Sequence, residues 1–224
     1  MQVDRILLDD RTISEFLSHF EDDIRELIQH IKKCEDIFES CFINSSGRSK
    51  KWVKEYLFLS IESTVSSIRL LSEGHINAAG NTMRISYESL CVSMLLTSPE
   101  LITVGRGKNK KEIDFNLAFE NGENIAKPHL AINTVVKNSD VLGLKEGENW
   151  LREAKNFYNG YSHASMMVFS SIVLESGKSI VGGGFNKEKL NIYAEHLKFI
   201  KRLLVHLPEI IEEIANRNLT RLGN

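Results

Sequence analysis

The sequence contains few of the residues from which disulfide frameworks, zinc sites or membrane spans are built. Its 224 residues include only three cysteines, an odd number without a CxxC spacing, which argues against both a disulfide framework and a zinc site. No apolar run approaches the roughly twenty residues that a membrane span requires, and no signal-peptide pattern opens the chain. We therefore expect a cytoplasmic protein with no bound metal and no contact with a membrane.

The chain also lacks a strong excess of charge of either sign. Its formal net charge is −2, so attraction to RNA or another polyanion requires a local basic patch. With 42% hydrophobic and 26% charged residues, the composition is that of an ordinary globular protein, and the length suits one domain. We expect a single domain over residues 1–224.

Apolar residues recur at steps of three and four along most of the chain, the spacing by which an α-helix buries one face. Long helices are expected over residues 12–43, 51–73, 76–97 and 190–214. Shorter helices are expected near 112–120, 123–137, 150–161 and 166–174. Together these elements predict an all-α fold, an antiparallel helical bundle with long first and last helices.

The middle and the end of the chain interrupt this rhythm. Residues 98–147 hold two loop segments and only short helices, so we expect an insertion or a mobile region there. The glycine-rich stretch from Ser176 to Gly184 predicts a turn, with at most one short β-hairpin near 176–185. Pro208 lies inside the last helix, where its missing amide predicts a kink or the start of a new segment.

The first and last helices carry long apolar seams, from Ile13 to Cys41 and from Leu190 to Ile214. These seams offer more apolar surface than one bundle is expected to bury. A homodimer through the long helices is therefore expected.

One polar pair stands out on the third helix. Arg84 and Glu88 are four residues apart and share a helix face, between the apolar Met83, Ile85 and Tyr87. One interpretation is a surface ion pair that contributes about 0.5 kcal/mol or less to stability. The other is a site in which Arg84 holds a phosphate or stabilises a transition state while Glu88 orients it.

A second polar group lies where two helices are expected to meet, at Tyr158, Ser162 and His163. The His163 imidazole can exchange protons near neutral pH, with the tyrosine or the serine to position it. Alternatively, Ser162 is the N-cap of the following helix, His163 is a first-turn residue without chemistry, and Tyr158 only packs.

Four cations follow one another in a glycine-containing loop, namely Arg106, Lys108, Lys110 and Lys111. Such a loop can bind RNA phosphates through flexible point charges. It can equally be a solvated loop without a ligand.

The helix pair that leads through Gly74 and a stretch of small residues into Arg84-Ile85-Ser86-Tyr87-Glu88 resembles bacterial helical proteins of the HEPN superfamily. The tyrosine, serine and histidine of the later helix junction are also similar to those of related members. The similarity covers roughly residues 50–100 and 150–215. Many HEPN proteins are metal-independent RNases of toxin–antitoxin, abortive-infection and CRISPR-linked systems, and they dimerise so that arginine and histidine from both subunits meet in one cleft.

The resemblance implies roles for particular residues. Arg84 would stabilise the phosphate or the transition state, and His163 would act as the acid or base, with Glu88, Tyr158 and Ser162 in support. It also implies an RNA substrate, a homodimer, a cognate antitoxin or defence partner, and no cofactor. The usual signature places arginine and histidine four to six residues apart on one helix, whereas here the histidine comes from a later segment.

Two hypotheses follow for the function. The first is an endoribonuclease of stress response or antiphage defence, which cleaves RNA by attack of its 2′-hydroxyl. The second is a non-catalytic helical interaction or nucleotide-binding module, such as an antitoxin-like or sensor subunit of a defence system.

Overall fold

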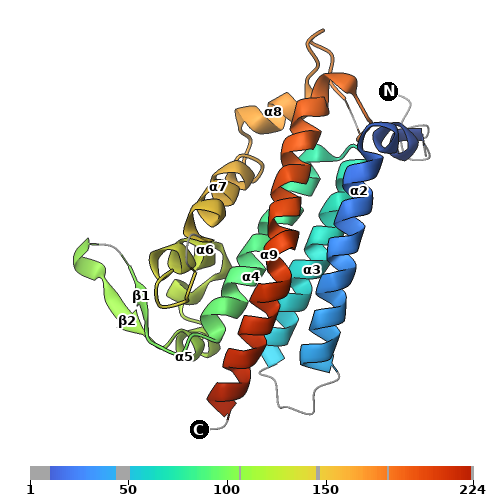
Figure 1. The fold of residues 1–224 in the computed structure, drawn as a ribbon. Coiled ribbons are helices and arrows are strands. Elements are labelled where there is room, and N and C mark those ends of the chain that lie inside the picture. Colours follow the sequence, from blue (N-terminus) through green and yellow to red (C-terminus); the bar gives the residue numbers. More distant parts are fainter. Residues whose placement is uncertain (1–10, 44–50, 106, 145–146, 181, 223–224) are drawn as a thin grey trace.

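The computed structural model describes residues 11–43, 51–105, 107–144, 147–180 and 182–222 (Figure 1). Four long helices form what we call the framework: α2 (Arg11–Phe38), α3 (Lys51–Ser72), α4 (Ile76–Leu96) and α9 (Leu190–Leu222). The outer layer comprises α5 (Phe115–Glu120), α6 (Pro128–Lys137), α7 (Gly147–Asn159) and α8 (Met166–Ile172), with strands β1 (Ile102–Val104) and β2 (Lys111–Ile113). A π-helical turn, η1 (Glu39–Ile43), follows α2. The expected all-α bundle with long first and last helices is confirmed.

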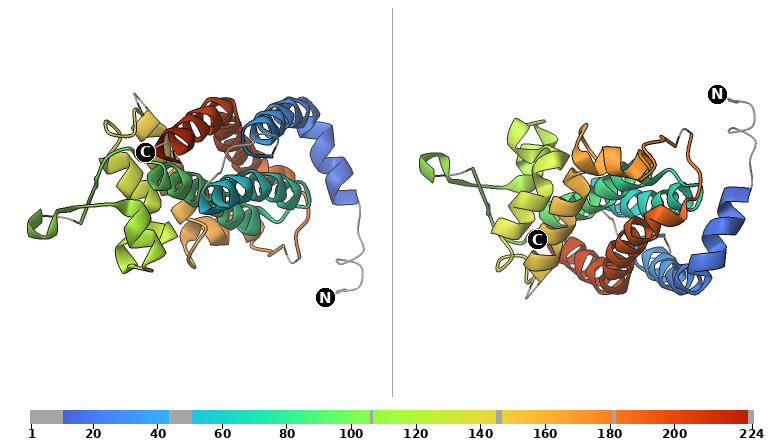
Figure 2. Two further views of the ribbon diagram at one scale, coloured as in Figure 1. Left: turned by 90° about the horizontal axis from the view of Figure 1, so that it is seen from below. Right: turned by 90° about the horizontal axis from the view of Figure 1, so that it is seen from above.

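The framework helices lie side by side, with the outer layer along one side of them (Figure 1). α2, α3 and α4 alternate in direction, and α9 runs the same way as α2 and α4. The β1–β2 hairpin stands away from the bundle, on the side opposite the start of α2 (Figure 2). None of the described helices combines the length and apolarity that crossing a bilayer requires.

A glycine turn joins α3 to α4, as the sequence predicts. Gly74 has a φ of +79°, a conformation that favours glycine. A Cβ atom on Gly74 would lie only 2.3 Å from the backbone nitrogen of Gly184. The glycine-rich stretch before α9 therefore passes directly over this turn, and the close approach of two backbones explains its composition.

Small polar side chains let α3 and α4 pack closely. Ser86 Oγ donates to the carbonyl oxygen of Ser60 at 2.8 Å and lies 2.7 Å from Thr64 Oγ1. Nearer the turn, Ser67 Oγ donates to the carbonyl oxygen of Ala79 at 2.9 Å. Because these buried hydroxyls have partners, the cost of removing them from water is offset.

The apolar seams of α2 and α9 meet inside the molecule, where Leu27, Cys34 and Leu204 are at most 1% exposed. Of the two outcomes expected at Pro208, a kink or the start of a new segment, the second is excluded, because α9 continues through this residue. Proline lacks the amide that would bond the carbonyl oxygen of Leu204, one turn earlier. The Cys34 thiol donates to this oxygen instead, at an S···O distance of 3.9 Å.

The seam of α9 is filled within the chain. Its apolar residues that are at most 4% exposed are Tyr193, Leu197, Ile200, Leu203, Leu204, Leu207, Ile211 and Ile214. The seam of α9 is therefore buried within one chain, whereas Ile13 at the start of the α2 seam is 38% exposed, and the homodimer stays a prediction.

The seam of α2 is not straight. Phe20 has non-helical dihedral angles (φ −130°, ψ 21°), so α2 bends there and its first part lies across the end of the bundle (Figure 1). The Phe16 ring packs edge-on against Phe185 and Tyr193, at centroid distances of 6.3 and 5.5 Å. The bend thus lets the start of α2 cover the segment just before α9 and the first turn of α9.

The described part of residues 98–147 packs against the framework through α6, whose Ala131 and Val135 are at most 1% exposed. Asn138 fixes the start of the hairpin, because its side chain accepts from the Thr103 amide at 2.8 Å and donates to the Thr103 carbonyl at 2.9 Å. The β1–β2 hairpin itself was not expected, since its segment reads as an exposed basic loop. Near 176–185 the structure holds a turn closed by one isolated bridge, between Val173 and Ser179.

Candidate functional site

The Arg84–Glu88 pair forms as its spacing predicts. Arg84 Nε donates to Glu88 Oε1 at 2.8 Å, and the two side chains are 24% and 14% exposed. This half-buried position is screened less by solvent than an open helix face. Glu88 therefore holds the guanidinium in one direction and leaves its other N–H groups as donors for a ligand.

The end of α7 packs against the part of α4 that carries this pair. The Tyr161 ring lies on Gly80, where a Cβ atom would approach Tyr161 Cγ to 2.5 Å. Further along α4, the rings of Tyr87 and Tyr158 have their centroids 5.7 Å apart. Arg84 lies between Gly80 and Tyr87 in the sequence of α4, and at about 100° per residue all three fall on the same side of the helix.

His163 lies in the short connection between α7 and α8, with an exposed side chain. Among the described residues, its imidazole has no hydrogen bond, ion pair or ring contact. Ser162 Oγ donates to the carbonyl oxygen of Asn159 at 2.9 Å. The interpretation of Ser162 as the N-cap of the next helix is wrong, because Ser165 accepts from the Val168 amide there. The imidazole is thus open to a ligand, while Ser162 holds the turn.

Tyr158 is buried, with 1% of its surface exposed, so it does not face a ligand. Burial raises the pKa of its hydroxyl well above the ordinary value, which keeps the group neutral. Its Oη has no hydrogen-bond partner among the described residues. Any support that Tyr158 gives the site comes from packing.

A buried histidine was missed by the sequence analysis. His196 of α9 is 0% exposed, with ring centroids 4.7 Å from Tyr161 and 5.1 Å from Phe157. Burial lowers its pKa to about 3, so the imidazole is neutral near pH 7. Neither ring nitrogen has a partner among the described residues. The available signal was its place on the seam, three residues after Tyr193.

The described cations of the predicted basic loop have different surroundings. Lys108 is exposed, Lys111 Nζ lies 4.0 Å from a carboxylate oxygen of Glu123, and Arg106 is outside the described residues. Lys110 instead lines an open pocket that is also bounded by α6 and α7. Among the described cations of the loop, Lys110 is therefore the one that lines a pocket in which an anionic ligand could bind.

Within the described residues, no three histidine, cysteine, aspartate or glutamate side chains are grouped so as to hold a metal ion. The chain matched no protein-family model, no curated protein and no solved structure. The function is therefore inferred from the chemistry of the site itself.

Proposed function

We propose that the protein is a HEPN-like, metal-independent endoribonuclease of the cytoplasm that acts in stress response or antiphage defence. One observation carries the proposal. The half-buried Arg84–Glu88 pair lies on the stretch of α4 whose Gly80 and Tyr87 contact Tyr161 and Tyr158, and the chain runs from Tyr161 directly into the exposed His163. An oriented guanidinium and an imidazole open to solvent are the two groups that phosphodiester transfer uses most directly.

The proposed reaction needs no group beyond RNA, the side chains and water. The 2′-oxygen attacks the adjacent phosphorus, the bond from phosphorus to the 5′-oxygen breaks, and the products end in a 2′,3′-cyclic phosphate and a 5′-hydroxyl. Neutral His163 takes the proton of the 2′-hydroxyl, and the imidazolium or water returns a proton to the leaving 5′-oxygen. Arg84, held by Glu88, donates to the phosphoryl oxygens as their charge rises.

The test is cleavage of a labelled RNA by the purified protein in the presence of a chelator. We expect products with cyclic phosphate ends, and a rate that falls by about 10²-fold or more in His163→Ala. His129→Ala, which removes another exposed histidine, is the matched control and should cleave at the wild-type rate. Cleavage of a 2′-deoxy substrate, an unchanged rate in His163→Ala, or no cleavage by the wild type would each contradict the proposal.

A second candidate function is supported by α8, which follows His163 after two residues. Met166, Phe169 and Ile172 are 78%, 51% and 37% exposed and lie at steps of three along this short helix. Apolar side chains that share an exposed face favour a non-catalytic module that binds a partner protein. In that case Phe169→Asp abolishes the cellular effect of the protein while His163→Ala leaves it unchanged.

A further inference from the structure

The pocket lined by Lys110 lies between three elements of the outer layer and has a volume of about 730 Å³. Its lining comes from the hairpin, from α6, from Ile125 just before α6 and from Arg152 of α7. We call this pocket the hairpin groove. Its position beside α7 puts it on the helix that ends at the candidate catalytic site.

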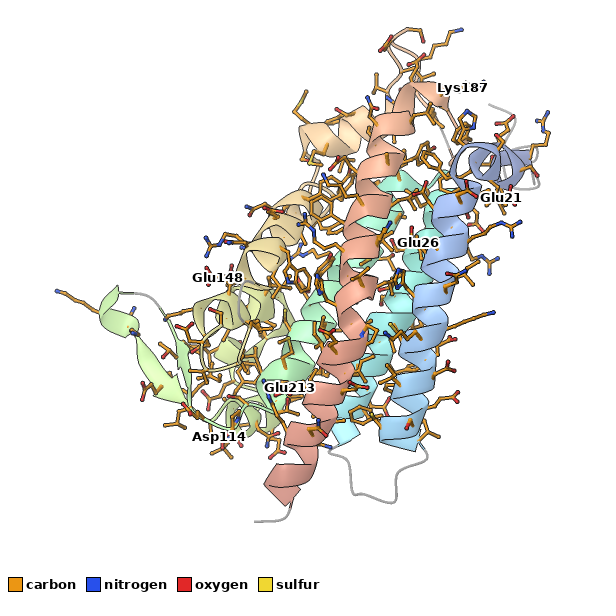
Figure 3. The ribbon with its side chains drawn as sticks, in the orientation of Figure 1. Glu21, Glu26, Asp114, Glu148, Lys187 and Glu213 are labelled. Carbon is orange, nitrogen blue, oxygen red and sulfur yellow. The ribbon has the colours of Figure 1, made fainter. Side chains whose placement is uncertain are left out.

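The charge of the hairpin groove is positive. Among the residues that the structure describes, its lining includes Lys110, Lys137 and Arg152 and no carboxylate. Lys137 Nζ donates to the carbonyl oxygen of Gly105 at 2.8 Å, which ties the hairpin to α6. Glu148 lies at the start of α7 (Figure 3), and its carboxylate is 3.8 Å from Arg152, longer than a charged hydrogen bond. The cations are thus incompletely neutralised and suit a ligand with several negative charges.

The other lining side chains show which part of such a ligand is recognised. They are small, amide-bearing or aliphatic, such as Val104, Ile125 and Leu130, and in the described part of the chain none of them is aromatic. Bases are held in single-strand sites chiefly by stacking on aromatic rings, which this groove does not offer. Its cations instead suit phosphates, which carry no sequence information.

A line of polar side chains connects the hairpin groove with the candidate catalytic site. Arg152, Lys155 and Asn159 are at positions i, i+3 and i+7 of α7 and therefore share one flank of the helix. Lys155 Nζ donates to Asn133 Oδ1 of α6 at 2.7 Å, which places this flank on the α6 side. Four residues after Asn159 comes His163.

We propose that the hairpin groove binds the phosphate backbone of single-stranded RNA and that the strand follows α7 toward Arg84 and His163. The inference rests on the proposed function, because attack of a 2′-oxygen in line with the leaving oxygen needs an unpaired, flexible strand. Binding in the hairpin groove adds Lys137 and Arg152 to the predicted RNA-binding residues. Because the groove contacts phosphates, binding is independent of base sequence.

The experiment measures binding of a labelled 2′-O-methyl RNA of about ten nucleotides, which cannot be cleaved by its own 2′-oxygen, by anisotropy at several salt concentrations. Lys110→Gln and Arg152→Gln should each weaken binding several-fold and lower the salt slope by about 0.7, the value for one phosphate contact on a single strand. Lys32→Gln on α2, across the bundle from the hairpin (Figure 2), is the matched control and should bind like the wild type. Wild-type affinity and slope in both groove variants would overturn the inference.

Competition distinguishes the source of the phosphate. Unlabelled RNA of mixed sequence should displace the probe at far lower concentration than ATP or inorganic phosphate. Displacement by ATP at the same concentration as RNA, or tighter binding of duplex RNA, would overturn the assignment to single-stranded RNA. Groove-dependent binding without any cleavage would refute the proposed function alone, whereas cleavage that both groove variants retain in full would refute this inference alone.

Discussion

The framework and its boundary with the outer layer differ in how they treat buried polar groups. Between α3 and α4, the hydroxyls of Ser60, Thr64 and Ser86 all have hydrogen-bond partners. Where α7 meets α9, Tyr158 Oη and both ring nitrogens of His196 have none among the described residues, and the framework has one such atom, Asn77 Oδ1 at the start of α4. An unpaired buried group costs about 1–3 kcal/mol. Stability is thus concentrated in the framework. The candidate site lies at the boundary with the outer layer, where unpaired buried groups lower the stability.

The largest contrast is expected from truncating an apolar side chain on each side of this boundary. Leu204→Ala in α9 opens a cavity in the core and should lower the free energy of unfolding by about 2–5 kcal/mol. Phe169→Ala in α8 removes a side chain that is 51% exposed and should change it by about 0.5 kcal/mol or less. Urea unfolding measures both, and equal losses would break the division between framework and outer layer.

A contrast in pH dependence is expected from His196. Its pKa of about 3 in the folded protein lies below the unfolded value of about 6.5, so the unfolded state binds more protons between these values. Stability is therefore full above pH 6.5 and falls as the pH drops, by about 2 kcal/mol at pH 5 through this group. His196→Phe removes the titrating group without opening a large cavity.

Urea unfolding of the wild type and His196→Phe from pH 7.5 to pH 4.5 checks this prediction. The difference between the two free energies should grow in favour of the variant as the pH falls. A difference that stays constant over this range would show that His196 is hydrogen-bonded or hydrated in the folded protein.

A smaller effect is expected where α4 and α7 touch. In Gly80→Ala the new methyl group meets the Tyr161 ring. Overpacking should outweigh the gain in helix propensity of about 1 kcal/mol and lower the free energy of unfolding by about 1 kcal/mol. In a Tyr161→Ala background the same change should be neutral or stabilising, because the obstacle is gone. Additive effects of the two substitutions on the free energy of unfolding would mean that the contact does not hold α7 in place.

The helices could be predicted from the sequence because apolar side chains recur at steps of three and four. The Arg84–Glu88 pair could also be predicted, because residues four apart share a helix face. The β1–β2 hairpin could not, since strands of three residues with a charged outer strand carry almost no alternation. Pro208 was expected to kink α9 or to begin a new segment. Only the tertiary structure shows that the Cys34 thiol bonds the Leu204 carbonyl, which the proline leaves unpaired.

The candidate site was predicted only in part, because its residues come together through packing between helices. Ser162 and His163 are adjacent in sequence. The exposure of His163 and the hydrogen bond from Ser162 to the backbone both depend on where α7 ends. His196 occupies a seam position where the sequence alone does not distinguish a buried from a solvated imidazole. Lys137 and Arg152 join Lys110 only when α6, α7 and the hairpin are assembled.

The central claim is that Arg84 of the framework and His163 of the outer layer act on one phosphodiester. The most direct test is a double-mutant cycle on the rate of RNA cleavage, with Arg84→Ala, His163→Ala and the double variant, each first shown to unfold at the wild-type temperature. We predict that the double variant is about as slow as the slower single variant, because groups that act as a unit are strongly non-additive. Losses that multiply, or a wild type that does not cleave RNA, would contradict the account.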